Sequence, residues 1–253
     1  MQLYHRELGE GKPLIILHGL FGSSDNWLSV GKILAEQYKV YLLDQRNHGQ
    51  SFHSDEFSYQ AMAADLLEFV QQQGIRDPHI LGHSMGGKTA MWFAAQHTDL
   101  WDKLIVVDIG PKSYPVHHRT ILDGLLSIDM DALSSRVEAD QQLAKYIPEI
   151  GVRQFLLKNL ARNGQGFQWK INLPAINENI EIIGEGMEEK EITHKQVLFI
   201  RGAKSDYIQD EDMTLIKTIF PGAELATVEG AGHWVHAEKP QELLAMVNRF
   251  LGV

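Results

Sequence analysis

A serine flanked by glycines is the strongest chemical signal in the sequence. Residues 82–86 read GHSMG, so Ser84 has a glycine two positions to either side. An apolar pair at 80–81 precedes this pentapeptide and a stretch of helical character, 88–95, follows it, which is the context that a nucleophile elbow requires. Such a turn is sharp and strained, and small flanking residues let the backbone close in around the serine. The pattern predicts a nucleophilic hydroxyl at the head of a helix, whose dipole favours developing negative charge.

A second signal lies at residues 18–22, HGLFG, directly after the apolar run 14–17. This segment resembles the His-Gly oxyanion loops of the α/β-hydrolase superfamily. The resemblance implies that the backbone N–H groups of Leu20 and Met85 form an oxyanion hole, which donates to the oxygen that becomes negative in a tetrahedral intermediate. His18 itself is expected to bond local backbone and to serve as scaffolding.

The base must be an imidazole that accepts the serine proton, and a carboxylate must hold that imidazole in the right tautomer. Twelve histidines compete for this role. In the superfamily the order along the chain is serine, acid, histidine, with the histidine on the loop after the last strand, which favours His233. His83 is expected to pack and orient, because a sequence neighbour cannot easily turn its ring onto the Ser84 hydroxyl. His236 lies where the next helix starts and is expected to be structural.

Two aspartates compete for the role of the acid, Asp108 and Asp206. Many superfamily members carry the acid as Gly-x-x-Asp in the later loop, but that position, counted from Gly202, is Ser205. A slip of one residue near a strand end turns a side chain to roughly the opposite face, so Asp206 would need a distorted loop.

Three motifs bear on that choice: 44–51 (DQRNHGQS), the segment around Asp108, and 232–240 (GHWVHAEKP). They resemble the YbfF-type bacterial esterases, and this resemblance extends over nearly the full length of the chain. That group places its acid after the strand that precedes the cap, which maps onto Asp108. Asp108 is therefore the favoured acid, with Asp206 as the alternative, while Asp44 and Arg46 are expected to order a loop.

The elements that must position these residues alternate between short apolar runs and stretches of helical character. That alternation is typical of an α/β fold with a mostly parallel sheet and helices on both faces, here the α/β-hydrolase fold. Residues 4–8 alternate more and predict an antiparallel edge strand. The apolar runs lie at 13–17, 39–43, 79–81, 103–107, 197–200 and 225–228.

The longest interval between runs extends from Asp108 to residue 197 and predicts an insertion. Its apolar positions Val152, Phe155, Leu156 and Leu160 have helical spacing, and the charges of Arg153, Lys158 and Arg162 are expected to lie on solvated helix faces. Glycines and a proline predict several short helices joined by turns. We predict a hydrolase core at 1–111 and 195–253 and a helical cap at 112–194 that covers a cleft; the alternative is a helical subdomain that only adds stability.

Composition limits the other possibilities. The chain has 253 residues, 44% hydrophobic and 22% charged, which suits one sizeable core. A net charge of −10 without a run of Lys or Arg argues against nucleic-acid binding, and the absence of cysteine excludes disulfides and thiolate metal sites. The N-terminus has no apolar signal region and no run long enough to span a bilayer, so we expect a cytoplasmic protein without integral membrane association.

Together these residues predict a serine hydrolase for a small-molecule acyl ester or thioester, with Ser84, His233 and Asp108 as a triad and no cofactor or metal. Basic residues in the cap could meet an anionic group such as the phosphates of an acyl-CoA. A carbon–carbon hydrolase or lyase on the same triad, and a ligand-binding protein without turnover, remain the alternatives. The sequence does not indicate the oligomeric state.

Overall fold

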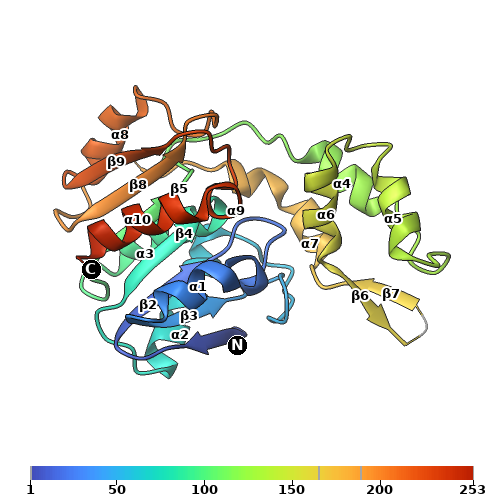
Figure 1. Cartoon of the computed structure of the whole chain (residues 1–253), viewed down its shortest axis with the longest axis horizontal. Coiled ribbons are helices and arrows are strands. Elements are labelled where there is room, and N and C mark those ends of the chain that lie inside the picture. The colour runs from blue at the N-terminus through green and yellow to red at the C-terminus, as the bar shows by residue number, and fades with distance from the viewer. Residues whose placement is uncertain (1, 165, 189, 253) are drawn as a thin grey trace.

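A seven-stranded sheet forms the frame of the molecule (Figure 1). The computed structural model describes residues 2–164, 166–188 and 190–252. The strand order is β1-β3-β2-β4-β5-β8-β9, with β1 antiparallel to β3 and the other neighbours parallel, which confirms the predicted mostly parallel sheet and its antiparallel edge. The strands are β1 (His5–Leu8), β2 (Lys12–Leu17), β3 (Tyr38–Leu43), β4 (His79–His83), β5 (Leu104–Val107), β8 (Val197–Gly202) and β9 (Ala223–Val228).

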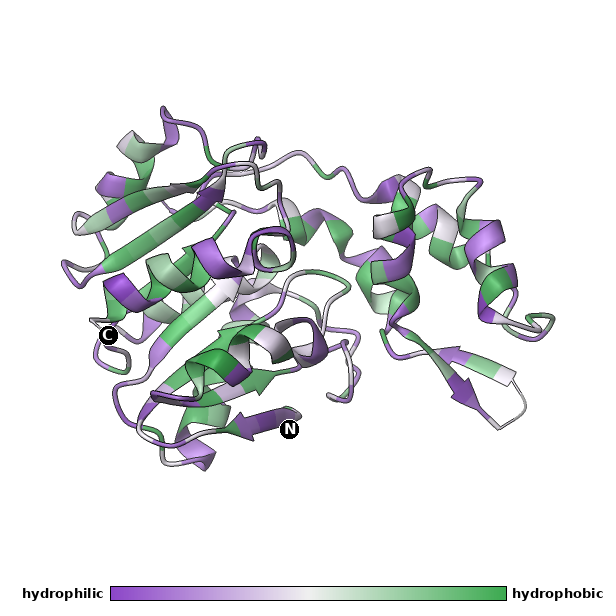
Figure 2. Cartoon of the chain, in the orientation of Figure 1, coloured by the Kyte–Doolittle hydropathy of each residue, from purple (hydrophilic) through white to green (hydrophobic). Residues whose placement is uncertain are grey.

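Helices cover both faces of this sheet, because alternate strand residues point to opposite faces. Leu14 and Ile16 belong to the apolar cluster with α1 and α10, whereas Ile15 and Leu17 belong to the cluster with α2, α3 and α8. Figure 2 shows β2, β3 and β8 hydrophobic along most of their length, while the edge strand β1 is hydrophilic. The helical elements of this part are η1 (Ser24–Trp27), α1 (Leu28–Leu34), α2 (Tyr59–Gln72), α3 (Met85–Gln96), α8 (Asp212–Ile219), α9 (Val235–Glu238) and α10 (Pro240–Leu251).

Residues 112–194 are here called the inserted segment; α4, α5, α6, α7 and the strands β6 and β7 of this segment lie to one side of the sheet (Figure 1), whereas Ile192 near its end packs against the sheet core. Their apolar cluster includes Leu122 and Leu156 and also contains Leu20 and Met85 from the sheet part. The inserted segment therefore packs against the predicted oxyanion loop and elbow, while its status as a separate cap remains a prediction. Its elements are α4 (Arg119–Leu126), α5 (Arg136–Leu143), α6 (Ile150–Leu157), β6 (Leu160–Asn163), β7 (Gly166–Trp169), α7 (Leu173–Glu178) and η2 (Ile180–Gly184).

Two expectations for this segment were wrong. The helix expected to include Leu160 ends at Leu157, and Leu160 begins the antiparallel hairpin β6–β7. Arg153, expected on a solvated face, is buried; its guanidinium donates to Asp140 at 2.8 Å and to the carbonyls of Ile147 and Pro148, both at 2.9 Å. These acceptors compensate the burial of the charge.

The stretch of chain that enters the inserted segment and the stretch that leaves it lie side by side. The N–H of Tyr114 donates to the carbonyl of Gly184, and the N–H of Met187 donates to the carbonyl of Pro111, both at 2.8 Å. A methyl group at Gly184 would lie 2.3 Å from the carbonyl oxygen of Tyr114, so only glycine permits this approach. We call this pair of adjacent passages, residues 110–116 and 183–187, the neck.

Lys88 fastens the neck to α3. Its side chain is fully buried, and its Nζ donates to the carbonyl of Lys112 at 2.8 Å and to the carbonyl of Glu185. The rings of Tyr59 and Tyr114 lie 5.8 and 5.0 Å from the same nitrogen. Burial lowers the pKa of Lys88 to about 7, with a smaller opposing contribution from Glu185.

This burial makes stability depend on pH in a defined direction. The unfolded lysine keeps its proton up to about pH 10.4, whereas the folded one releases it above about pH 7, so the folded state binds fewer protons between these values. We therefore predict that the free energy of unfolding of the wild type, relative to Lys88→Met, rises by about 1.4 kcal/mol per pH unit from pH 7 toward pH 10. Urea unfolding at a series of pH values measures this slope. The exposed Lys32→Met on α1 serves as the control, and a difference between wild type and Lys88→Met that is independent of pH would contradict the prediction.

Candidate active site

Ser84 occupies the turn between β4 and α3. Its backbone has φ 53° and ψ −120°, a sparsely populated conformation for a residue with a side chain. Close backbone contacts impose this turn: a methyl group at Gly82 would lie 2.2 Å from the carbonyl oxygen of Gly86, and one at Gly86 would lie 2.5 Å from the carbonyl oxygen of His18. The turn brings Ser84 to the N-terminus of a 12-residue helix at the carboxyl edge of the sheet.

A chain of hydrogen bonds connects three of the predicted site residues. The Oγ of Ser84 lies 3.0 Å from Nε2 of His233, and Nδ1 of His233 lies 2.7 Å from Oδ2 of Asp108. Asp108 has no solvent exposure, whereas 24% of the His233 side chain is exposed. The carboxylate accepts from Nδ1, which leaves Nε2 as the nitrogen that can accept the proton of Ser84.

Three donors converge on the Asp108 carboxylate. Oδ1 accepts from the N–H of Gly202 at 3.0 Å, and Oδ2 accepts from the hydroxyl of Ser205 as well as from His233. Ser205 occupies the Gly-x-x-Asp position, counted from Gly202, at which the superfamily pattern would place the acid. In this structure its hydroxyl donates to the Asp108 carboxylate. Asp206 is exposed, and of the two competing aspartates the structure brings Asp108 to His233.

The predicted oxyanion loop lies directly against the nucleophile. A methyl group at Gly19 would lie 3.2 Å from Cβ of Ser84, and Leu20 and Met85 are buried in one apolar cluster. Nδ1 of His18 bonds the carbonyl of Gly19 at 2.8 Å, as expected of a turn histidine, while its Nε2 accepts from the N–H of Gln45 at 3.0 Å. Burial lowers the pKa of His18 to about 4, so the ring is neutral and its tautomer is fixed.

Two supports of this loop did not emerge from the sequence. His48 accepts from the N–H of Phe21 at 3.2 Å, and Asn159 of the inserted segment donates to the carbonyl of Phe21 at 2.7 Å. Burial lowers the pKa of His48 to about 3, which keeps its ring an acceptor. His48 lies inside the motif at 44–51, which was a usable signal, but no pattern marks Asn159.

Two further histidines near the site, His83 and His236, are buried and neutral. Nε2 of His83 donates to the backbone carbonyl of His233 at 2.9 Å and so fixes the loop that carries the base. His236 stacks on Trp27 with ring centroids 4.4 Å apart. Burial lowers the pKa of His83 well below its ordinary value and lowers that of His236 to about 3. Both residues thus match the structural roles expected of them.

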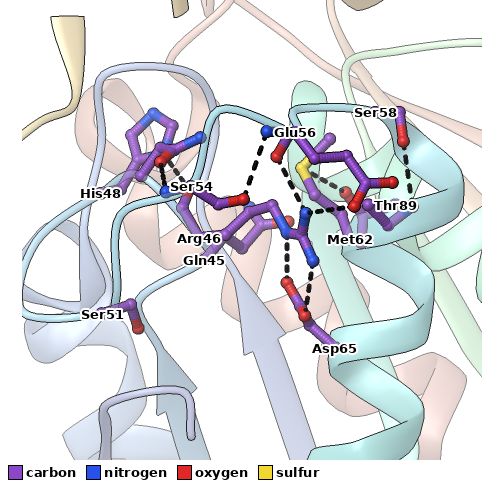
Figure 3. Close-up of polar contacts among 12 residues, drawn as sticks. Gln45, Arg46, His48, Ser51, Ser54, Glu56, Ser58, Met62, Asp65 and Thr89 are labelled. Atoms are coloured by element: carbon purple, nitrogen blue, oxygen red, sulfur yellow. Dashed lines mark hydrogen bonds and ion pairs between the residues drawn. The ribbon is translucent and has the colours of Figure 1, made fainter. Parts of the chain in front are cut away.

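Arg46 and Asp44 order the loop after β3. Figure 3 shows the Arg46 guanidinium directed at Asp65 of α2, with Nε and Nη2 donating to the carboxylate at 2.6 and 2.8 Å, and Nη1 donating to the carbonyl of Glu56. Asp44 accepts from the N–H of Ser24 at 2.6 Å and from that of Gln50 at 2.8 Å. These contacts fit the predicted structural roles.

Two cavities meet at Ser84. The larger, of about 280 Å³, also contains His233, Leu20 and Trp234 and is roofed by Phe155 and other residues of the inserted segment. The smaller, of about 20 Å³, contains Met85 and the apolar side chains of Ile109, Val116 and Ile183. His118 and Tyr207 line both, and the Tyr207 ring stacks on His233 with centroids 4.2 Å apart.

The residues described by the structure include no group of three or more His, Asp or Glu side chains placed to hold a metal ion. None of the helices in that same part of the chain combines the length and the apolar character needed to cross a bilayer.

Comparison with known proteins gives concordant matches. A family model described as alpha/beta hydrolase fold matches residues 12–146. The chain is 37% identical over 246 residues to the sn-1-specific diacylglycerol lipase ABHD11 of Mus musculus, covering 94% of this chain and 80% of the mouse protein. It is 35% identical over 240 residues to esterase YbfF of Escherichia coli strain K12, covering 94% and 92%. A solved structure of a marine microorganism esterase matches with a TM-score of 0.96 and 47% identity, covering 98% of this chain and 99% of that one.

The two aspartates give a direct test of the site. We predict that Asp108→Asn slows the reaction of Ser84 with a fluorophosphonate by about 10³–10⁴-fold, because the amide no longer holds the proton-accepting tautomer of His233. Asp206→Asn, the matched exposed variant, is expected to react within about twofold of the wild type. The labelling rate is measured by mass spectrometry. The opposite pattern, with Asp206→Asn slow and Asp108→Asn near normal, would make Asp206 the acid.

Proposed function

The chain belongs to the α/β-hydrolase family, and from the geometry around Ser84 we propose that it is a carboxylic ester hydrolase that acts through an acyl-enzyme. The observation that carries this proposal is the connected pair of hydrogen bonds from Ser84 to His233 and from His233 to Asp108, at 3.0 and 2.7 Å. Relatives named esterase and lipase, similar over most of their own lengths, support the same class of reaction.

In the first step Ser84 Oγ attacks the ester carbonyl carbon while His233 Nε2 takes the serine proton. The carbonyl oxygen becomes negative and accepts hydrogen bonds from the backbone N–H groups of Leu20 and Met85. The helix N-terminus at Met85 adds a favourable dipole. His233 then gives its proton to the departing oxygen, and the bond from the carbonyl carbon to that oxygen breaks.

In the second step water attacks the acyl-Ser84 ester, and His233 accepts a proton from that water. The acid product leaves, and the proton returns to Ser84 Oγ. Asp108 accepts the Nδ1–H hydrogen bond throughout. A thioester would follow the same route with a thiol as the leaving group, so thioester cleavage is part of the proposal.

We also propose that the inserted segment acts as a cap. Val152, Phe155 and Leu156 of α6 line the larger cavity, and Asn159 bonds the oxyanion loop directly. A cap in this position limits the access of water to the site and supplies one wall of the cavity that a substrate would enter.

Mass spectrometry tests the acyl-enzyme. Incubation with p-nitrophenyl acetate is expected to release p-nitrophenolate and to leave an acetyl group on the peptide that contains Ser84. Ser84→Ala is expected to lose the adduct and to lower turnover by about 10³-fold or more. A series of p-nitrophenyl esters and acyl-CoA thioesters compares the two substrate classes. Turnover that survives in Ser84→Ala, or a wild type that forms no adduct with any acyl donor, would overturn the proposed function.

A further inference from the structure

The site distinguishes the two halves of an ester, and this inference rests on the proposed function. The tetrahedral carbon formed on Ser84 carries the serine oxygen, the oxyanion, the leaving group and the acyl chain. The oxyanion must point to the Leu20 and Met85 N–H groups, and the leaving oxygen must point to Nε2 of His233, which protonates it. The acyl chain takes the one direction that remains.

The two cavities at Ser84 match these directions. The larger one contains His233, so the leaving group, which receives the proton of that ring, occupies it. Ser84 and Met85 line the smaller cavity. Among the residues that the structure describes, His233 and Leu20 do not line it. The smaller cavity is therefore the space beside the nucleophile that the proton donor does not line, and it is the space left for the acyl chain.

The sizes of the cavities are very unequal. The larger has about 280 Å³ and the smaller about 20 Å³. A volume of roughly 10–15 Å³ on this scale admits one water molecule, so the smaller cavity has room for about one group of methyl size. The larger cavity is lined by Phe155, Trp234 and Trp27 and offers an apolar, aromatic surface.

Hydrogen bonds hold the walls of the smaller cavity in place. The hydroxyl of Tyr59 donates to the carbonyl of Ile183 at 2.9 Å, and that of Tyr114 donates to the carbonyl of Tyr207 at 2.6 Å. Gly184, which also lines the cavity, accepts a hydrogen bond from the N–H of Tyr114 in the neck. Lys88 of α3 donates to the carbonyl of Lys112 in the same neck. A longer acyl chain would have to displace walls that these hydrogen bonds hold in place.

We propose that the enzyme is selective for acetyl and similarly short acyl groups carried on bulky apolar alcohols, and that Val116 and Ile183 limit the length of the acyl chain. The selectivity is opposite for the two halves of the substrate: the acyl side is short because the neck closes it, and the alcohol side is large because the cap roofs an open cavity.

Two ester series test this assignment. In the first series the alcohol is constant, as p-nitrophenol, and the acyl chain runs from acetyl to octanoyl. In the second series the acyl group is acetyl and the alcohol runs from methanol to 1-naphthylmethanol. We expect kcat/KM to fall at least about tenfold from acetyl to butyryl, and to rise with the size of the alcohol. A wild-type enzyme that cleaves octanoyl esters as well as acetyl esters, or that disfavours large alcohols, would overturn the proposal.

Two matched truncations locate the selectivity. Val116→Ala opens the smaller cavity and is expected to raise the ratio of butyryl to acetyl kcat/KM by about tenfold. Val152→Ala, the same chemical change in the larger cavity, is expected to alter the preference among alcohols and to leave the acyl ratio within about twofold of the wild type. Equal effects of the two variants on the acyl ratio would contradict the assignment of the cavities.

The outcomes also separate this inference from the proposed function. Absence of any ester turnover together with absence of the Ser84 adduct would overturn the proposed function. Ester turnover that depends on Ser84 but favours long acyl chains would leave the proposed function standing and would overturn only the short-acyl assignment.

Discussion

The contact on which the site depends is the backbone crossing at Gly82 and Gly86. The carbonyl of Gly86 lies against Gly82, and the carbonyls of Leu17 and His18, at the end of β2, lie against Gly86. A side chain at either glycine would collide with this backbone. This approach forces Ser84 into its positive φ and directs its hydroxyl away from the sheet. The conformational cost, about 1–3 kcal/mol for such a residue, is offset by the packing of β4, β2 and α3 around it. Asp108 reaches the same edge directly after β5, the neighbour of β4, and His233 reaches it on the loop after β9.

Burial keeps four histidines around the site neutral. His18, His48, His83 and His236 each have a lowered pKa because they are removed from water. In its neutral form each ring of the first three bonds backbone of the oxyanion loop or of the loop that carries His233. His233 alone among the histidines of the triad neighbourhood has both nitrogens engaged by side chains, Ser84 and Asp108. Burial thus separates one ring placed for proton transfer from three that hold backbone and from His236, which stacks on Trp27.

The sequence predicted the parts of the site that depend on local pattern. The elbow, the HGLFG loop and the mostly parallel sheet follow from spacing and from residue types, and Asp108 was favoured by resemblance to a family. The sequence could not predict contacts that depend on distant residues coming together, such as Asn159 with Phe21 or Lys88 with the neck. The hairpin β6–β7 was missed because Leu160 is buried at a helical interval from Leu156, and burial periodicity does not distinguish a short strand from the continuation of a helix. Arg153 was placed in solvent for a different reason: its acceptors, Asp140, Ile147 and Pro148, lie outside its own helix, and helical spacing does not reveal them.

The adjacent entry and exit of the neck have an evolutionary consequence. Because the two ends of the inserted segment are already paired, the sheet constrains only where that segment begins and ends. The entropic cost of closing a longer loop between fixed ends grows slowly, by roughly 0.6 kcal/mol for each doubling of length. Residues beyond the neck that make no contact with the oxyanion loop, unlike Asn159, can therefore be lengthened, shortened or exchanged while β5 and β8 remain neighbours. Such an arrangement lets related proteins acquire different substrates through changes in one contiguous stretch of chain and keep one catalytic edge unchanged.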